Sequence, residues 1–331
     1  MIPTLFVISL LIFLIVQLPP GSYVANELLE LRAQGQDAAA ARIAFLVSEF
    51  DLDRPLLVQY AIWIGIWPSE VRGFSGLLQG DLGWSFAYEQ PVAAVVGEAM
   101  PLTLLVNVAT VAFIYLLAFP IGVYSASRPY SWGDTGFTLL GYIGLATPNF
   151  LLGLVLLYYA HAWFGLSIGG LMDPRFLGVP WSAEKALSVA QHLVVPVVVI
   201  GTAGTAAIIR RLRANLMDEL RKPYVTAAAA RGARGLGRLR YPLKVALNPF
   251  IADIGNLLPS LVSGAVIVSV VLNLPTIGPV LLEALRSQDS FLAGFILLFV
   301  AGLTLAGMLV SDLLLGLVDP RIRFGLREAR G

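Results

Sequence analysis

Six stretches of the chain carry at most one charge over a length sufficient to cross a lipid bilayer. A membrane-spanning helix needs about 20 residues, and lipid offers the backbone no hydrogen-bond partners, so each span must be helical. The strands of a closed barrel would alternate over about ten residues, which these stretches do not. We therefore predict an all-α polytopic membrane protein with six transmembrane helices. Its spans lie within residues 1–26, 99–127, 135–172, 186–209, 245–282 and 290–318.

Composition supports this interpretation. Hydrophobic residues make up 57% of the 331 residues and charged residues only 13%, whereas soluble domains have about 25% charged residues. This excludes a soluble enzyme, a disordered protein and a nucleic-acid binder as first readings. The chain has no cysteine, and therefore no disulfide or thiolate metal site. The first stretch is predicted to be a span rather than a signal peptide, because no basic residue precedes it and no small-residue cleavage site follows.

The distribution of Lys and Arg predicts the orientation. The connections at 127–134, 210–244 and 319–331 hold 15 basic and 5 acidic residues, while the other set holds 7 basic and 14 acidic ones. Basic residues favour the cytoplasmic side, so both termini are predicted to be cytoplasmic.

This topology divides the chain into four parts. They are a first transmembrane helix (1–20), an extracytoplasmic loop region (21–98), a five-helix transmembrane core (99–318) and a cytoplasmic tail (319–331). The core includes a basic cytoplasmic segment at 210–249. Within the loop region, residues 38–50 are predicted to form a short helix.

The cytoplasmic segment has the pattern of two helices joined by glycines. Leucines at 212, 216 and 220 share a helical face, so the fourth span is predicted to continue into the cytoplasm until Pro223. Residues 226–231 predict a short helix that ends at Gly232 and Gly235, and an apolar face follows at Leu236, Leu239 and Leu243. Three interpretations remain open: a solvated basic loop, a contact with anionic lipid, and a docking element for a cytoplasmic protein.

Several strings along the chain carry a resemblance to a known family. They are Thr226-Ala227-Ala228 followed by Gly232, FDLDRP (50–55), VQY (58–60), GDLGWS (80–85), TPNF (147–150), LPTIG (274–278), ALRSQD (284–289) and DPRIR (319–323). They resemble the inner-membrane permeases of binding-protein-dependent ABC importers, in particular the B-type permease of the oligopeptide/dipeptide branch. The first string resembles the family's Glu-Ala-Ala loop, although the Glu is absent. Pro242 is a second departure and predicts a bend or an end of the helix there.

The resemblance implies a permease subunit in the bacterial inner (plasma) membrane, not an enzyme. A second homologous permease, two ATPase subunits and an extracytoplasmic solute-binding protein would be its partners. ATP and Mg²⁺ would bind those ATPases and not this chain, which lacks a Gly-x-x-x-x-Gly-Lys-Ser/Thr string. The residues implied to couple the chain to an ATPase are Tyr224, Thr226, Ala227, Ala228, Arg231, Gly232, Gly235, Leu236 and Leu239.

Few polar residues lie within the predicted spans. Asn107, Asn149 and Asn256 are candidates for lining the translocation pathway or for hydrogen bonds between helices. Asp253 and Asp312 are expected to pair with Arg or to cap helices near the cytoplasmic interface. We predict no catalytic group and no metal site.

The sequence therefore predicts an import permease for a peptide or a related small solute, with an oligosaccharide or a nickel complex as alternative substrates. A more distant alternative is a stand-alone membrane carrier or a membrane enzyme. Spans of an enzyme should show acids, His or Ser clustered at helical spacing, and a carrier usually shows internal repeats.

Overall fold

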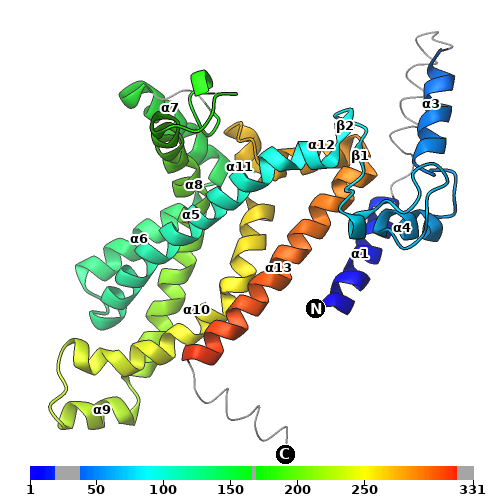
Figure 1. The fold of residues 1–331 in the computed structure, drawn as a ribbon. Helices are drawn as coiled ribbons and strands as arrows, with labels where there is room; N and C mark the ends of the chain where they lie inside the picture. Colours follow the sequence, from blue (N-terminus) through cyan, green and yellow to red (C-terminus); the bar gives the residue numbers. More distant parts are fainter. Residues whose placement is uncertain (19–37, 166–168, 177, 319–331) are drawn as a thin grey trace, which may run out of the picture. The chain divides into compact units, whose positions relative to one another are not determined.

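The computed structural model describes residues 1–18, 38–165, 169–176 and 178–318 (Figure 1). They form helices, two short 3₁₀ turns and one hairpin, in the order α1 (Ile2–Val16), α3 (Ala38–Glu49), α4 (Leu56–Ile64), η1 (Leu77–Gln79), β1 (Trp84–Ser85), β2 (Gln90–Pro91), α5 (Val92–Ser127), α6 (Trp132–Ala146), α7 (Asn149–Phe164), η2 (Pro174–Phe176), α8 (Ala183–Leu220), α9 (Pro223–Ala230), α10 (Leu236–Gly264), α11 (Val266–Val271), α12 (Ile277–Arg286) and α13 (Ser290–Val318).

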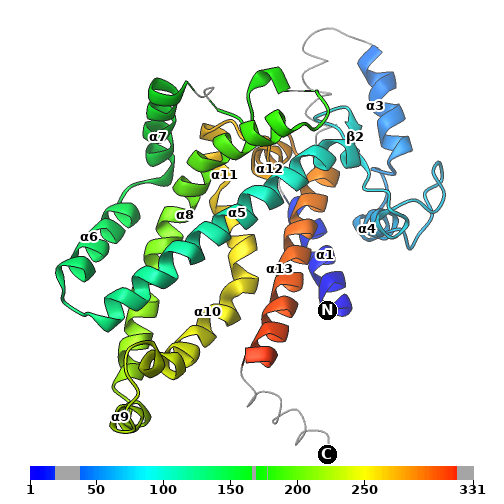
Figure 2. The same cartoon turned by 60° about the vertical axis from the view of Figure 1, so that its left-hand side comes forward.

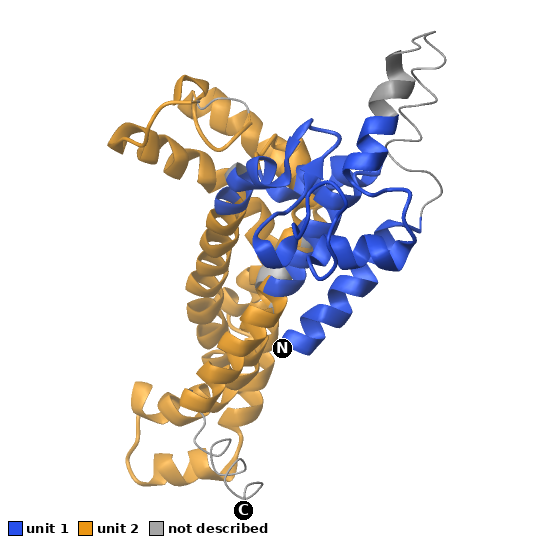
Figure 3. Cartoon of the chain, turned by 45° about the vertical axis from the view of Figure 1, so that its right-hand side comes forward, with its two compact units in different colours: residues 1–102, 276–302 blue, residues 103–275, 303–331 orange. Residues whose placement is uncertain are grey.

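The chain divides into two compact units (Figure 3). Unit 1 comprises residues 1–102 and 276–302. Its core joins α1 to α4, where Phe13, Tyr60, Trp63 and Ile64 are buried together. The Phe13 ring lies 5.6 Å from the rings of both Tyr60 and Trp63. The Tyr60 hydroxyl also lies 2.8 Å from Ser9 Oγ, which satisfies both polar groups inside this aromatic cluster.

Unit 2 comprises residues 103–275 and the chain from Leu303 on. Its central element is α8, which contacts α6, α7, α10 and α11. The helix buries small and branched side chains along its length, including Val199, Thr205 and Leu212. Small residues allow close approach between helices in a membrane: a Cβ at Gly204 would lie 2.9 Å from Ile114 of α5.

Three described helices are long and apolar enough to cross a membrane: α5, α8 and α13. A fourth span results if α6 and α7 are counted together. This confirms a polytopic helical membrane protein, but not the predicted number of six spans. Of the other two predicted spans, the first is α1, an apolar helix of 15 residues, or about 22 Å at 1.5 Å per residue. The second falls on α10 and α11.

The predicted span at 135–172 is not one straight helix. It consists of α6 and α7, which meet at an angle of 102°. Thr147 has an extended backbone, with φ −83° and ψ 123°, because a residue before proline disfavours the helical region. Pro148 then precedes the first turn of α7. The break therefore follows from the Thr-Pro step.

Other local expectations are met with small shifts. The helix expected at 38–50 is α3, and the fourth span does continue to Leu220. However, α10 passes through Pro242 without ending, and its ribbon changes direction along its length (Figures 1 and 2). The hairpin formed by β1 and β2 pairs Trp84 with Pro91 and was not predicted. The predicted tail at 319–331 lies outside the described residues.

Candidate functional site

The cytoplasmic segment between α8 and α10 contains a separate short helix, α9. It begins at Pro223, and proline suits the first turn because its missing N–H would be unsatisfied there anyway. Lys222 is extended ahead of it (φ −70°, ψ 148°). The helix predicted at 226–231 therefore starts three residues earlier, at the proline. Figures 1 and 2 show α9 at the end of unit 2, joined by loops on both sides.

Glu219 ties the end of α8 to the start of α9. The Tyr224 hydroxyl donates a hydrogen bond of 2.8 Å to Glu219 Oε2, and Lys222 Nζ pairs with Oε1. Burial, together with this carboxylate, raises the pKa of Tyr224 to about 12, so the phenol stays a donor at physiological pH. Tyr224 was predicted only because the string around it resembles the coupling loop of the family, whereas Glu219 was not predicted. Glu219 could have been found as an acidic residue within a strongly basic segment.

The remaining predicted coupling residues form an exposed surface on this segment. Val225 is buried and anchors α9, whereas Thr226, Ala227 and Arg231 are exposed and Ala228 is half-buried. Leu236, at the start of α10, is 85% exposed, and Leu239 is half-buried. A short helix with small residues, followed by an exposed leucine, can lie close to the backbone of a partner protein. The coupling role of these residues stays a prediction.

Two glycines shape the turn after α9. Gly232 has φ +90° and Gly235 has φ +53°, a left-handed conformation that glycine adopts without cost. The Gly232 N–H donates to the Ala229 carbonyl at 2.9 Å. No atom lies within 4 Å of a Cβ placed on either glycine. Backbone conformation, not lack of space, therefore requires glycine at both positions.

Ion pairs and hydrogen bonds hold the helices that carry this segment. Arg211 of α8 pairs with Asp253 of α10 at 2.6 Å, which confirms the expected pairing of Asp253 with an arginine. The Ser311 hydroxyl of α13 lies 2.7 Å from the carbonyls of Ile251 and Ala252. Asp312 is exposed. These contacts brace α10 against α8 and α13 within unit 2.

The three asparagines predicted as pathway candidates occupy different environments. Asn107 is buried in α5, and its Nδ2 has no hydrogen-bond partner within the described ranges. Asn149 is half-buried at the first position of α7. The side chain of Asn256 lies outside the described part of the chain. A pathway role for the three remains a prediction.

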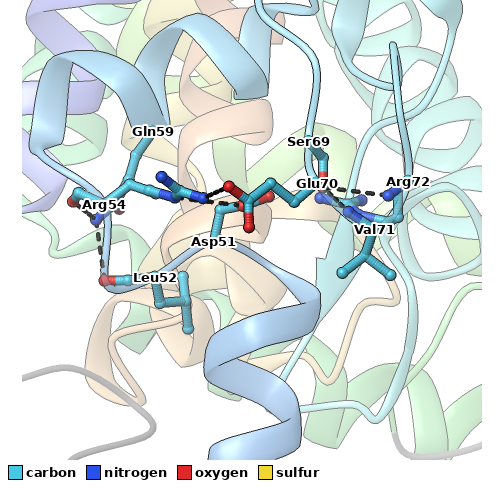
Figure 4. Close-up of polar contacts among 8 residues, drawn as sticks. All are labelled: Asp51, Leu52, Arg54, Gln59, Ser69, Glu70, Val71 and Arg72. Carbon is cyan, nitrogen blue, oxygen red and sulfur yellow. Dashed lines mark hydrogen bonds and ion pairs between the residues drawn. The ribbon is translucent and has the colours of Figure 1, made fainter.

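On the predicted extracytoplasmic side, the string at 50–55 forms a tight turn (Figure 4). Gln59 Nε2 donates to the carbonyls of Leu52 and Arg54, at 3.0 and 2.7 Å. Arg54 in turn pairs with Glu70, and the Ser69 hydroxyl accepts the N–H groups of Val71 and Arg72 at 3.2 Å each. Gln59 thus satisfies two carbonyls of the turn at 50–55.

The second string, GDLGWS, is organised by Asp81. Its carboxylate accepts hydrogen bonds from Ser75 and from the Gly83 N–H at 2.9 Å, and Arg72 Nη1 lies 3.4 Å away. Burial opposes ionisation, but these hydrogen bonds and Arg72 outweigh it and lower the pKa of Asp81. The strings FDLDRP and GDLGWS therefore form structural turns of unit 1.

The start of α13 is fastened to the hairpin by Asp289, which is fully buried. Its carboxylate accepts from Ser85 Oγ at 2.6 Å and from the Ala87 N–H at 3.1 Å. The other oxygen accepts the Leu292 N–H at 3.2 Å, as an N-cap of α13. Burial raises the pKa of Asp289, although these hydrogen bonds oppose the shift.

Replacing Asp289 with alanine is expected to destabilise unit 1 by about 2 kcal/mol. The substitution leaves buried donors without an acceptor and removes the N-cap. Thermal unfolding of the purified chain in mild detergent measures the loss, with Asp53→Ala, at an exposed carboxylate of the same unit, as the matched control. If Asp289→Ala and Asp53→Ala unfold at the same midpoint temperature, Asp289 does not hold the start of α13 to the hairpin.

The same residue predicts a pH dependence. Because the folded-state pKa of Asp289 is raised, the folded chain holds this proton more tightly than the unfolded chain does. Its contribution to stability is therefore full at acid pH and is lost as pH rises through the folded pKa. The stability of Asp289→Ala should vary less over that window than the stability of the wild type.

Comparison with known proteins places these features in one family. Residues 118–324 match the family model for binding-protein-dependent transport system inner membrane components. An oligopeptide transport system permease protein of Bacillus subtilis is 30% identical over 98% of this chain and 96% of its own length. A glutathione transport system permease of Pectobacterium atrosepticum is 29% identical, with the same coverage of both chains. A nickel import system permease of Staphylococcus aureus is 27% identical over 98% of this chain and 90% of its own.

Proposed function

Because this chain belongs to the family of binding-protein-dependent transport system inner membrane components, and so is a permease subunit and not an enzyme, we propose that it imports peptides or related small solutes. The observation that carries the proposal is the extent of the match to relatives named for oligopeptide and glutathione transport, which cover 98% of the chain. Glutathione is itself a peptide, so these two names agree in substrate chemistry. A nickel complex, suggested by the Staphylococcus relative, or an oligosaccharide is the alternative substrate.

The proposed topology has six spans with both termini in the cytoplasm. In this arrangement α1 is the first span, α6 and α7 together form the third, and α10 with α11 forms the fifth. The charge distribution supports the arrangement, because the connections assigned to the cytoplasm hold 15 basic residues against 7 on the other side. The large loop region would then receive the solute-binding protein.

The proposed assembly contains a second, homologous permease and two ATPase subunits that hydrolyse ATP with Mg²⁺. The surface formed by α9 and the start of α10 would lie in a groove on one ATPase. Its exposed alanines allow close contact with the ATPase. The contacts of Glu219 with Tyr224 and Lys222 would transmit movement of α9 to α8. Conformational change driven by ATP would then alternate the permeases between outward-open and inward-open states.

Copurification tests the assembly. The tagged chain is extracted from native membranes in a mild detergent, and the proteins that accompany it are identified by mass spectrometry. We expect a second permease, ATPase subunits and a solute-binding protein. Recovery of the chain alone, in a detergent that preserves known importer complexes, would favour a stand-alone carrier.

Uptake tests the substrate separately. Cells that express the complete importer should accumulate a labelled oligopeptide, and excess unlabelled peptide should compete with it. Competition by a nickel complex or an oligosaccharide, but not by peptide, would replace the proposed substrate and leave the assembly intact.

A further inference from the structure

A cavity of about 410 Å³ lies between α6 and α8 at the end of unit 2 that is proposed to face the cytoplasm. The two helices contact each other and are close where small residues meet: a Cβ at Gly144 would lie 2.6 Å from Thr202 Cγ2. The cavity extends from this region toward Asp134 in the first turn of α6 and toward Arg210 and Arg213 of α8. Its position is therefore set by the small residues that join α6 to α8.

The lining combines apolar and polar side chains. Leu139, Leu145, Ala206 and Ile209 supply apolar groups. Thr135, Thr138 and Tyr142 of α6 supply hydroxyl groups at helical spacing, and Tyr130 adds a fourth at the far end. From Thr135 to Leu145 the helix rises about 15 Å, which is about half of the 30 Å hydrocarbon core. The residues of α6 that line the cavity thus span a length comparable to the thickness of one lipid leaflet.

The polar end carries an excess of positive charge. The charged residues in the lining are Asp134, Arg210 and Arg213. Arg213 is used in a bidentate pair with Asp134, with both distances at 2.8 Å. Arg210 is exposed and forms no ion pair within the described ranges, and the neighbouring Arg211 is already paired with Asp253. Among the residues that the structure describes, the Arg210 guanidinium at the mouth of the cavity therefore has no carboxylate partner.

Aromatic residues mark the mouth as a membrane interface. Tyr130 is 82% exposed and Trp132 is 94% exposed, as expected of amphipathic rings at the headgroup level. Tyr130 is held with φ +62°, while its N–H donates to Asp134 Oδ2 at 2.7 Å and the Arg213 guanidinium lies 5.6 Å from its ring. Left-handed conformations of bulky residues are costly and gather at ligand-binding sites.

We propose that this cavity binds an anionic phospholipid of the inner leaflet. The phosphate would pair with Arg210, the hydroxyls of Tyr130, Thr138 and Tyr142 would bond the headgroup, and an acyl chain would lie along Leu139 and Leu145. Basic pockets between membrane helices are suited to such headgroups. The assignment to the inner leaflet rests on the proposed topology. The binding of an anionic lipid does not depend on the transported substrate.

Photo-crosslinking tests the site. The purified permease, with the subunits that accompany it, is placed in phosphatidylcholine nanodiscs. These contain a small fraction of either phosphatidylglycerol or phosphatidylcholine with a photoreactive acyl chain. We expect crosslinks within 135–145 and 206–209, with labelling by the glycerol probe about fivefold stronger. One basic residue near an anionic headgroup contributes about 1 kcal/mol, which corresponds to that ratio.

Arg210→Gln should abolish this preference, and Arg210→Lys should retain most of it because it keeps the charge. Arg128→Gln is the matched control: it removes a charge near the same helix, but Arg128 does not line the cavity and lies 5.6 Å from the Tyr124 ring. Equal labelling by the two probes in the wild type would overturn the proposal. So would crosslinking of the cavity residues to a partner subunit instead of to lipid. Neither result depends on transport, so the proposed importer function would stand.

Discussion

Replacing Gly232 with proline is expected to leave the chain inserted in the membrane but to reduce coupled uptake to background. Gly232 has φ +90°, whereas proline fixes φ near −65°. The substitution also removes the N–H that donates to Ala229, and it disfavours the conformation of Arg231 just before it, at φ −82° and ψ 9°. The turn from α9 to α10 would therefore be rebuilt, and the proposed ATPase contact would be lost with it. Uptake of labelled peptide and ATPase activity of the assembled importer measure the effect.

Gly232→Ala separates backbone conformation from gross disruption. A Cβ at this position meets no atom within 4 Å, so alanine adds only the cost of a left-handed backbone, roughly 1–2 kcal/mol. We expect uptake to fall by about fivefold or more. Gly302→Ala is the control, since Gly302 lies in α13 in open space. Wild-type uptake by Gly232→Pro, at normal protein levels, would refute the coupling role of α9.

Prolines show how far the sequence alone can predict this fold. Proline in a membrane helix is expected to kink or break it, yet of Pro148 and Pro196 only Pro148 stands at a break, of 102°. Pro196 is buried inside the continuous helix α8. Neighbouring helices can support a helix that has lost a hydrogen bond, and this support depends on packing that the local sequence does not contain. A proline in the sequence indicates where a helix can break, and the tertiary contacts decide whether it does.

The candidate site likewise combines local features that the sequence predicts with long-range contacts that it does not. The turn at Gly232 and Gly235 depends on local residues and was predicted, whereas the start of α9 lies at Pro223, three residues before the predicted one. The hydrogen bond between Ser85 and Asp289 joins residues 204 positions apart. The spacing of such a pair carries no periodic signal, so only the folded chain reveals it. The resemblance strings mark these positions but do not give their partners.

The ion pair between Asp134 and Arg213 gives the largest expected change in stability. It joins residues 79 positions apart and fastens the first turn of α6 to α8. The Asp134 carboxylate is almost fully buried, and it also accepts the Tyr130 N–H. Arg213→Met would leave this carboxylate without its counter-charge while keeping most of the side-chain volume. We expect the free energy of unfolding to fall by about 3 kcal/mol, as for other broken buried pairs.

A double-mutant cycle isolates the pair. Asp134→Asn removes the charge that Arg213→Met would strand, so the double variant should be more stable than the sum of the single losses predicts. A coupling energy of about 1–3 kcal/mol is expected for residues in direct contact, measured by denaturant unfolding in detergent. The control is Arg175→Met, because the Arg175 side chain is 71% exposed and its approach to Asp173 is 3.8 Å; such pairs contribute little. If Arg213→Met unfolds at the same denaturant concentration as Arg175→Met, the pair does not hold α6 against α8. The close approach of Gly144 to Thr202 would then be the contact that holds the two helices together.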